Sequence, residues 1–264
     1  MQTQIAVRVI AKDGKFLGDD IGGSYVTVRD AMTREILAQG KTSGGSGLNG
    51  KGGVMCVALR RGQPLPTAEA SQFLATLDLT APRQIEVSAY GPLAARGSAN
   101  TASATQWVFP GKDITAGDGF LLELPGLICQ IVNPPTHFAT GSLKELCIRA
   151  NVAMMCGCPI EPKSGVTRNC CDLCDDEQPW LPHEFEVMAI VQSGGQTVDQ
   201  VKLDFVPIPP APTAGQFEGV WKTIPENGGV FEITVYAYQK ANGNTGVDVA
   251  TLVIGPPPCK DQPS

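Results

Sequence analysis

Short runs of alternating apolar residues, separated by turn-forming residues, constrain the fold of this chain more than any other feature. The first run, at residues 5–10, precedes Asp13 and Gly14, a dipeptide that is typical of hairpin turns. Similar runs follow at residues 25–28, 35–38, 54–59, 84–89, 105–109, 119–124, 127–132, 143–153, 184–191, 198–205, 219–224, 230–239 and 246–254. Residues 68–77 alone look weakly helical. This period of two predicts an all-β chain built from antiparallel β-sandwiches.

The length of the chain favours two domains. A chain of 264 residues exceeds the usual size of one small sandwich, and domains commonly hold about 100–150 residues. Asn133, Pro134 and Pro135 form the best candidate boundary, because consecutive prolines stop strands and stiffen linkers. We therefore expect one sandwich at residues 1–134 and a second at 135–258, with a cysteine-rich insertion at 154–180 and a tail at 259–264.

Two segments resemble known β-sandwich families. Residues 23–45 read GSYVTVRDAMTREILAQGKTSGG, a strand, a short turn and a second strand that ends in a Thr and Gly-rich turn. This order resembles the transthyretin-like, carboxypeptidase-regulatory-like domains. Residues 230–254 contain two strand patterns around an Asn-Gly turn and resemble the final hairpin of a bacterial immunoglobulin-like domain. The first resemblance implies an accessory module of a secreted or surface protein, with no catalytic residues.

Charge and hydropathy exclude some partners. The net charge of −6 and the absence of a basic run argue against binding to a nucleic acid backbone. No apolar stretch approaches the length of a transmembrane helix. The first residues lack the features of a signal peptide, but the cysteine content favours an extracytoplasmic location, with the signal peptide absent from this sequence.

Nine cysteines indicate either disulfides or a soft-metal site. The insertion has few large apolar residues, so disulfides would be the simplest way to order it. An odd count leaves at least one cysteine as a free thiol or paired between chains, and Cys56 is the candidate because its surroundings look like a buried strand. The disulfide candidates are Cys129, Cys147, Cys156, Cys158, Cys170, Cys171, Cys174 and Cys259. The sequence leaves their pairing open.

The competing interpretation is a metal site. Met154 and Met155 precede Cys156 and Cys158, and thioethers beside thiolates are the soft donors that suit Cu(I). His137 and His183 are the only imidazoles that could join them. Copper is the one cofactor that this interpretation would bring, and otherwise none is expected.

The predicted function follows from the β-rich pattern and from the absence of a recognisable catalytic motif. We expect a non-catalytic extracytoplasmic structural or recognition protein that forms part of a surface assembly, with a protein partner or self-association through exposed strand edges. The alternative is a periplasmic copper-binding protein that uses residues 154–158. A hydrolase stays open as a third class, although few aromatic residues are present to line a sugar cleft.

Overall fold

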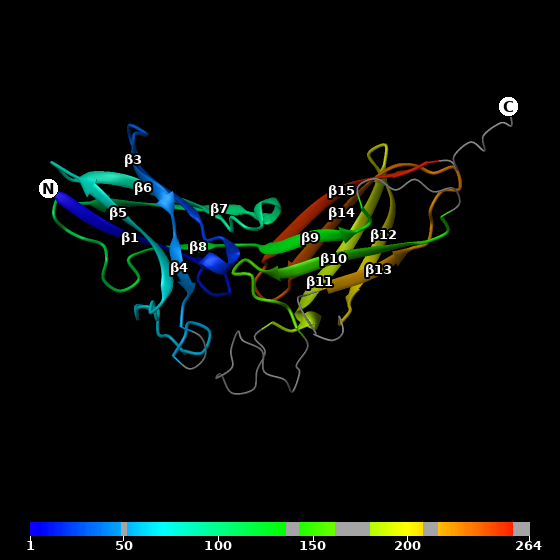
Figure 1. Cartoon of the computed structure of the whole chain (residues 1–264), viewed down its shortest axis with the longest axis horizontal. Helices are drawn as coiled ribbons and strands as arrows, with labels where there is room; N and C mark the ends of the chain where they lie inside the picture. Colours follow the sequence, from blue (N-terminus) through cyan, green and yellow to red (C-terminus); the bar gives the residue numbers. More distant parts are fainter. Residues whose placement is uncertain (49–51, 136–142, 162–179, 208–215, 256–264) are drawn as a thin grey trace, which may run out of the picture. The chain divides into compact units, whose positions relative to one another are not determined.

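The computed structural model describes residues 1–48, 52–135, 143–161, 180–207 and 216–255. Fifteen strands and three short 3-10 turns make up the regular structure of these residues, without an α-helix (Figure 1). The all-β prediction is therefore confirmed. None of the described residues forms a helix long and apolar enough to span a membrane.

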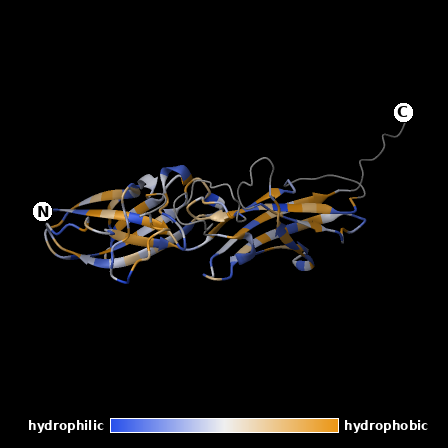
Figure 2. Ribbon diagram, turned by 90° about the horizontal axis from the view of Figure 1, so that it is seen from below, coloured by the Kyte–Doolittle hydropathy of each residue, from blue (hydrophilic) through white to orange (hydrophobic). Residues whose placement is uncertain are grey.

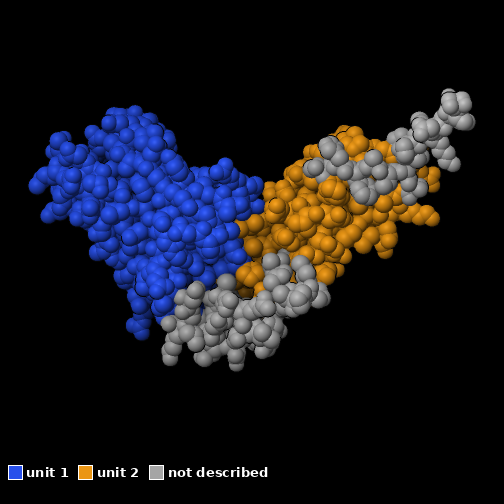
Figure 3. Space-filling model, viewed as in Figure 1, with its two compact units in different colours: residues 1–126, 154–158, 163–179 blue, residues 127–153, 159–162, 180–264 orange. Residues whose placement is uncertain are grey.

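The chain divides into two compact units (Figure 3). Unit 1 comprises residues 1–126 together with the short segment Met154–Cys158. The described part of unit 2 comprises residues 127–153, 159–161, 180–207 and 216–255. The division at Gly126 thus falls before the boundary expected at residue 134.

Unit 1 contains two four-stranded sheets. The first has the order β4-β5-β1-β8 and is antiparallel except for the parallel pair β1 and β8. The second, β3-β2-β6-β7, is antiparallel throughout. The strands are β1 (Gln2–Ala11), β2 (Tyr25–Asp30), β3 (Ile36–Lys41), β4 (Ser43–Ser46), β5 (Ala70–Asp78), β6 (Arg83–Gly91), β7 (Asn100–Val108) and β8 (Phe120–Leu124).

The core of unit 1 follows from the alternation in its strands. Ile85, Val87 and Ala89 of β6 are fully buried, while the residues between them are partly exposed. Figure 2 shows the same change between hydrophobic and hydrophilic residues along the strands. Burial of one face of each sheet holds the two sheets together as a β-sandwich.

Unit 2 contains one seven-stranded sheet of order β15-β14-β11-β12-β13-β10-β9. Its two end strands, β9 and β15, lie close to each other. The Ile131 amide of β9 donates a 2.8 Å hydrogen bond to the Asp248 carboxylate of β15. Trp221 and Phe231 pack edge to face in the core, with ring centroids 5.0 Å apart. The strands are β9 (Leu127–Asn133), β10 (Leu146–Met154), β11 (Phe185–Ser193), β12 (Gln196–Phe205), β13 (Gln216–Trp221), β14 (Gly229–Gln239) and β15 (Thr245–Ile254).

Two local predictions are wrong. Residues 54–59 form turns and irregular backbone, because the approach through Gly52 and Gly53 closes into a turn in which the Cys56 amide bonds to the Gly53 carbonyl. Residues 68–77 hold most of β5, which pairs with β1 from Gln2 to Val7. Pairing with a neighbouring strand outweighs a weak local preference for helix.

Candidate functional site

The segment Met154–Cys158 forms a tight turn that belongs to unit 1. The Met154 amide donates a 2.9 Å hydrogen bond to the Cys158 carbonyl, and the Gly157 amide donates one of 2.8 Å to the Met154 carbonyl. Gly157 has a φ of +81°, a conformation that glycine adopts without strain. The turn therefore brings Cys156 and Cys158 to the same small region, and we call it the thiol turn.

The sulfur-bearing side chains of the thiol turn are buried. Met154 and Met155 are completely inaccessible, and Cys156 and Cys158 are 2% and 3% exposed. Gly157, between the two cysteines, is exposed. Solvent thus reaches the tip of the turn, one residue from either thiol.

A second turn of unit 1, just after β1, supplies polar groups to Cys156. The Gly14 amide donates a 3.0 Å hydrogen bond to the Ala11 carbonyl, and the Ala11 amide donates one of 2.9 Å to the Lys15 carbonyl. A Cβ atom at Gly14 would lie 2.9 Å from Ala11 Cβ and 3.2 Å from Cys156 Sγ. Only glycine allows this close approach, and it leaves the buried Lys15 next to the thiol.

These neighbours stabilise the thiolate of Cys156. The Cys158 thiol donates a hydrogen bond to it, the backbone amides of Lys15 and Cys158 donate two more, and the Lys15 ammonium adds positive charge. Together they outweigh burial, which opposes ionisation, and lower the pKa of Cys156. The geometry therefore supports a thiolate ligand or nucleophile at this position.

The other two described thiols of the predicted set have inert surroundings. Burial, with a smaller contribution from Asp248, raises the pKa of Cys129 to about 12. Burial and the carboxylate of Glu218 raise the pKa of Cys147 as well. Cys129 is a buried core residue of unit 2, whereas Cys147 is only half-buried.

The disulfide predictions need correction. Cys129, Cys147, Cys156 and Cys158 take part in no disulfide bond in the structure. Their own strands and turns already order them, so no disulfide is required to do so. Cys56 is disulfide-bonded, so the prediction that it is the unpaired cysteine is wrong. Cys170, Cys171, Cys174 and Cys259, with most of the predicted insertion, lie outside the described residues.

The predicted metal donors are brought together only in part. Met154, Met155, Cys156 and Cys158 share the thiol turn, whereas His183 is exposed in the 3-10 turn Pro182–Glu184 of unit 2. His137 lies outside the described residues. Within the described ranges, no group of three or more His, Cys, Asp or Glu residues could hold a metal ion. Among the described residues, Cys156 and Cys158 are the thiol donors that the thiol turn offers to a metal.

Lys15 is the functional residue that the sequence did not reveal. The Asp13-Gly14 turn before it was predicted, but Lys15 and Cys156 are separated by most of the first unit. No local pattern indicates that this lysine is buried beside a thiol.

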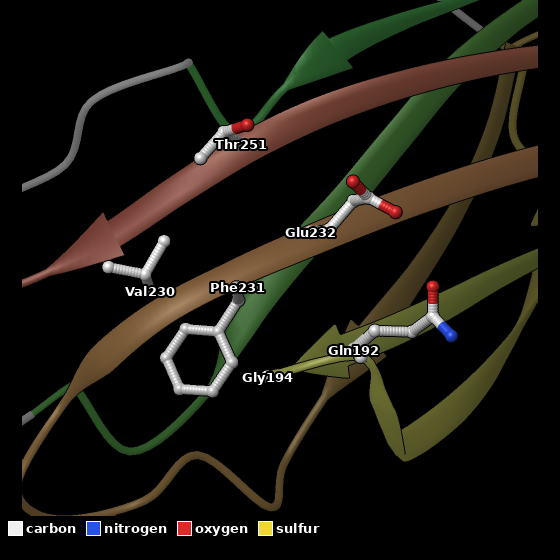
Figure 4. Close-up of a pocket in the computed structure, with 7 residues that line it drawn as sticks. Gln192, Gly194, Val230, Phe231, Glu232 and Thr251 are labelled. Carbon is white, nitrogen blue, oxygen red and sulfur yellow. The ribbon is translucent and has the colours of Figure 1, made fainter.

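Unit 2 has a shallow pocket of about 440 Å³. Gln192, Glu232 and Thr251 project from three neighbouring strands, β11, β14 and β15, and line it in register (Figure 4). Glu232 is the only ionisable residue in the lining. Glycoside hydrolysis uses a pair of carboxyl groups, and this lining has only the one of Glu232.

The free edge of β7 is the second candidate surface. β7 pairs with β6 along its whole length and ends its sheet, and no described strand pairs with its other edge. Its sequence, NTASATQWV, has no charged residue and no proline. Trp107 is 55% exposed although tryptophan usually lies largely buried. An uncharged, nine-residue edge is open to strand addition.

Comparison with known proteins adds little to this description. No family model matches the chain, and no curated protein sequence matches it. Matches among solved structures include the fibronectin(III)-like modules of CbhA from Clostridium thermocellum. That similarity covers 100% of this chain and 99% of the other, with 9% identity and a TM-score of 0.27. A likeness this distant supports no family assignment.

Proposed function

We propose that the protein is a non-catalytic, extracytoplasmic structural or recognition protein that takes part in a surface assembly by self-association. The observation that carries this proposal is the free edge of β7. The other edges of unit 1 have features that discourage strand addition: β3 carries Lys41, β4 has only four residues, and β8 has five residues with Glu123 exposed. β7 has none of these features.

A second copy of this chain is the partner that β7 fits. Antiparallel pairing of two β7 strands about Ala104 would place Ser103 opposite Thr105 and Thr101 opposite Trp107. Because the strand is uncharged, this symmetric pairing brings no like charges together. A two-fold axis uses the same surface on both copies, as most homodimers do.

The location and the wider role are supported by the sequence. Nine cysteines are more common in proteins of oxidising compartments than in the cytosol. The pattern at residues 23–45 resembles transthyretin-like domains, which are usually accessory modules of secreted or surface proteins. This resemblance agrees with a protein that binds rather than catalyses.

Sedimentation of the full chain over a range of concentrations tests the proposal. We expect dimers to form on the order of 10–100 µM, because a single pair of strands makes a small interface. The double change Ser103→Lys and Thr105→Lys should leave a monomer, since it places like charges at the pairing edge. Gln196→Lys with Thr197→Lys, at an exposed end of the interior strand β12, is the matched control and should associate as the wild type does. A wild type that stays monomeric, or a β7 variant that still dimerises, would refute the proposal.

The second candidate function is periplasmic soft-metal binding, with copper as the metal. The observation that favours it is the thiol turn, in which two cysteines outside any disulfide are in contact and two methionines next to them in the sequence are buried. Elemental analysis of protein purified with and without reductant tests it. Copper near one equivalent would support this function, and its absence from both preparations after exposure to Cu(I) would reject it.

A further inference from the structure

The thiol turn has the donors for a metal that accepts two ligands. Cys156 and Cys158 are within hydrogen-bonding reach of each other, and Gly157 between them is exposed. Structural Zn²⁺ sites normally use four protein ligands, and the described residues offer no third His, Cys, Asp or Glu here. Cu(I) is softer and is stable between two thiolates.

We propose that Cys156 and Cys158 bind one Cu(I) as a two-coordinate bis-thiolate centre, and that Lys15 offsets its negative charge. This inference rests on the second candidate function. Two thiolates and one Cu(I) carry a net charge of −1, and each thiol that is protonated releases its proton to solvent on binding. No electron is transferred, because copper enters and stays as Cu(I).

Lys15 suits this centre because it is only 5% exposed and lies close enough to Cys156 to act on it electrostatically. A buried negative centre is costly unless positive charge or hydrogen-bond donors compensate it. The backbone amides of Lys15 and Cys158 supply the donors, and the Lys15 ammonium supplies the charge. A centre of two thiolates and Zn²⁺ would be neutral, so the positive charge of Lys15 would not stabilise it. Lys15 therefore favours the centre with monovalent Cu(I), whose net charge is −1.

Gly14 fixes the distance between the two turns. Its missing Cβ allows Cys156 Sγ to approach the backbone that presents the Lys15 amide. The copper site is therefore formed by two segments of unit 1 that lie far apart in the sequence.

The test is competition of the reduced full chain with the chromophoric Cu(I) chelator bicinchoninate, without oxygen. We expect one Cu(I) per chain, lost in both Cys156→Ser and Cys158→Ser and retained in the control Cys147→Ser. Lys15→Met keeps the backbone amide and removes only the charge, so it should weaken Cu(I) binding by about tenfold. Lys15→Arg should restore most of the affinity, and melting curves show whether each variant is folded.

The outcomes separate this inference from the function on which it rests. If the wild type binds no Cu(I), both are wrong. If copper binds but Cys156→Ser and Cys158→Ser leave binding unchanged, the site is wrong. If only Lys15→Met has no effect, or if Zn²⁺ binds as tightly as Cu(I), soft-metal binding stands and the role of Lys15 is refuted.

Discussion

The two units treat the edges of their sheets in opposite ways. In unit 2 the end strands β9 and β15 lie against each other, joined by the hydrogen bond from Ile131 to Asp248. In unit 1 the edge strands β7 and β8 approach each other, and the Asn100 side chain of β7 donates a hydrogen bond to the Pro125 carbonyl, but no backbone ladder between described strands covers the free edge of β7, which is mostly exposed. A sheet that brings its ends together hides its backbone groups, whereas an open sheet needs charges, short strands or a partner. The contrast therefore supports the proposal that self-association uses the β7 edge of unit 1.

The largest expected effect comes from comparing a buried aromatic residue of unit 2, Phe231, with the exposed Trp107 of β7. The comparison tests whether Trp107 contributes to a hydrophobic core. Phe231→Ala in unit 2 removes a buried ring that packs on Trp221, and it should lower the free energy of unfolding by about 3–5 kcal/mol. Trp107→Ala should change it by less than about 0.5 kcal/mol, because the ring is more than half exposed. Urea unfolding followed by circular dichroism measures both. Equal losses in the two variants would show that β7 is covered in the monomer.

A change at Gly246 tests the closure of unit 2. A Cβ atom there would lie 2.5 Å from the Leu127 carbonyl oxygen of β9, so Gly246→Ala must push β9 and β15 apart. We expect a loss of about 1–3 kcal/mol, the usual cost of overpacking, and faster hydrogen exchange in β9. Gly97→Ala is the control, since its Cβ would meet nothing within 4 Å. If β9 exchanges as slowly in Gly246→Ala as in the wild type, the two edges do not depend on each other.

The sequence predicted where the strands of both units lie better than it predicted which strands pair with each other. Alternation along β6 and β14 reports which face is buried, so the all-β class follows from local pattern. The partner of a strand is not local, which is why β5 looked helical and residues 54–59 looked like a strand. The candidate site shows the same limit. The Cys156 and Cys158 pair was visible in the sequence, but Lys15, which acts on Cys156, lies far from both cysteines along the chain.

The smallest expected effect concerns an ion-pair cluster on the sheet that ends in β7. The Glu86 carboxylate of β6 accepts hydrogen bonds from Arg29 and from Arg34, the latter at 2.7 Å. The bond from Arg29 is the main cause that lowers the pKa of Glu86, against a smaller opposing effect of burial. Because the pKa is lower in the folded chain, this stabilisation is present above the unfolded value of about 4.3 and disappears as the pH falls through the folded value.

Unfolding measured between pH 6 and about pH 2 should therefore show stability falling below about pH 5, and Glu86→Gln should reduce that fall. Solvent screens these side chains, so the difference should stay below about 1 kcal/mol and shrink at high salt. Glu123→Gln, an exposed carboxylate on β8, is the matched control. If both variants follow the same pH curve as the wild type, the ion-pair cluster does not contribute to the free energy of unfolding. Backbone pairing with β6 and the core of the sandwich would then be what stabilises β7 in its sheet.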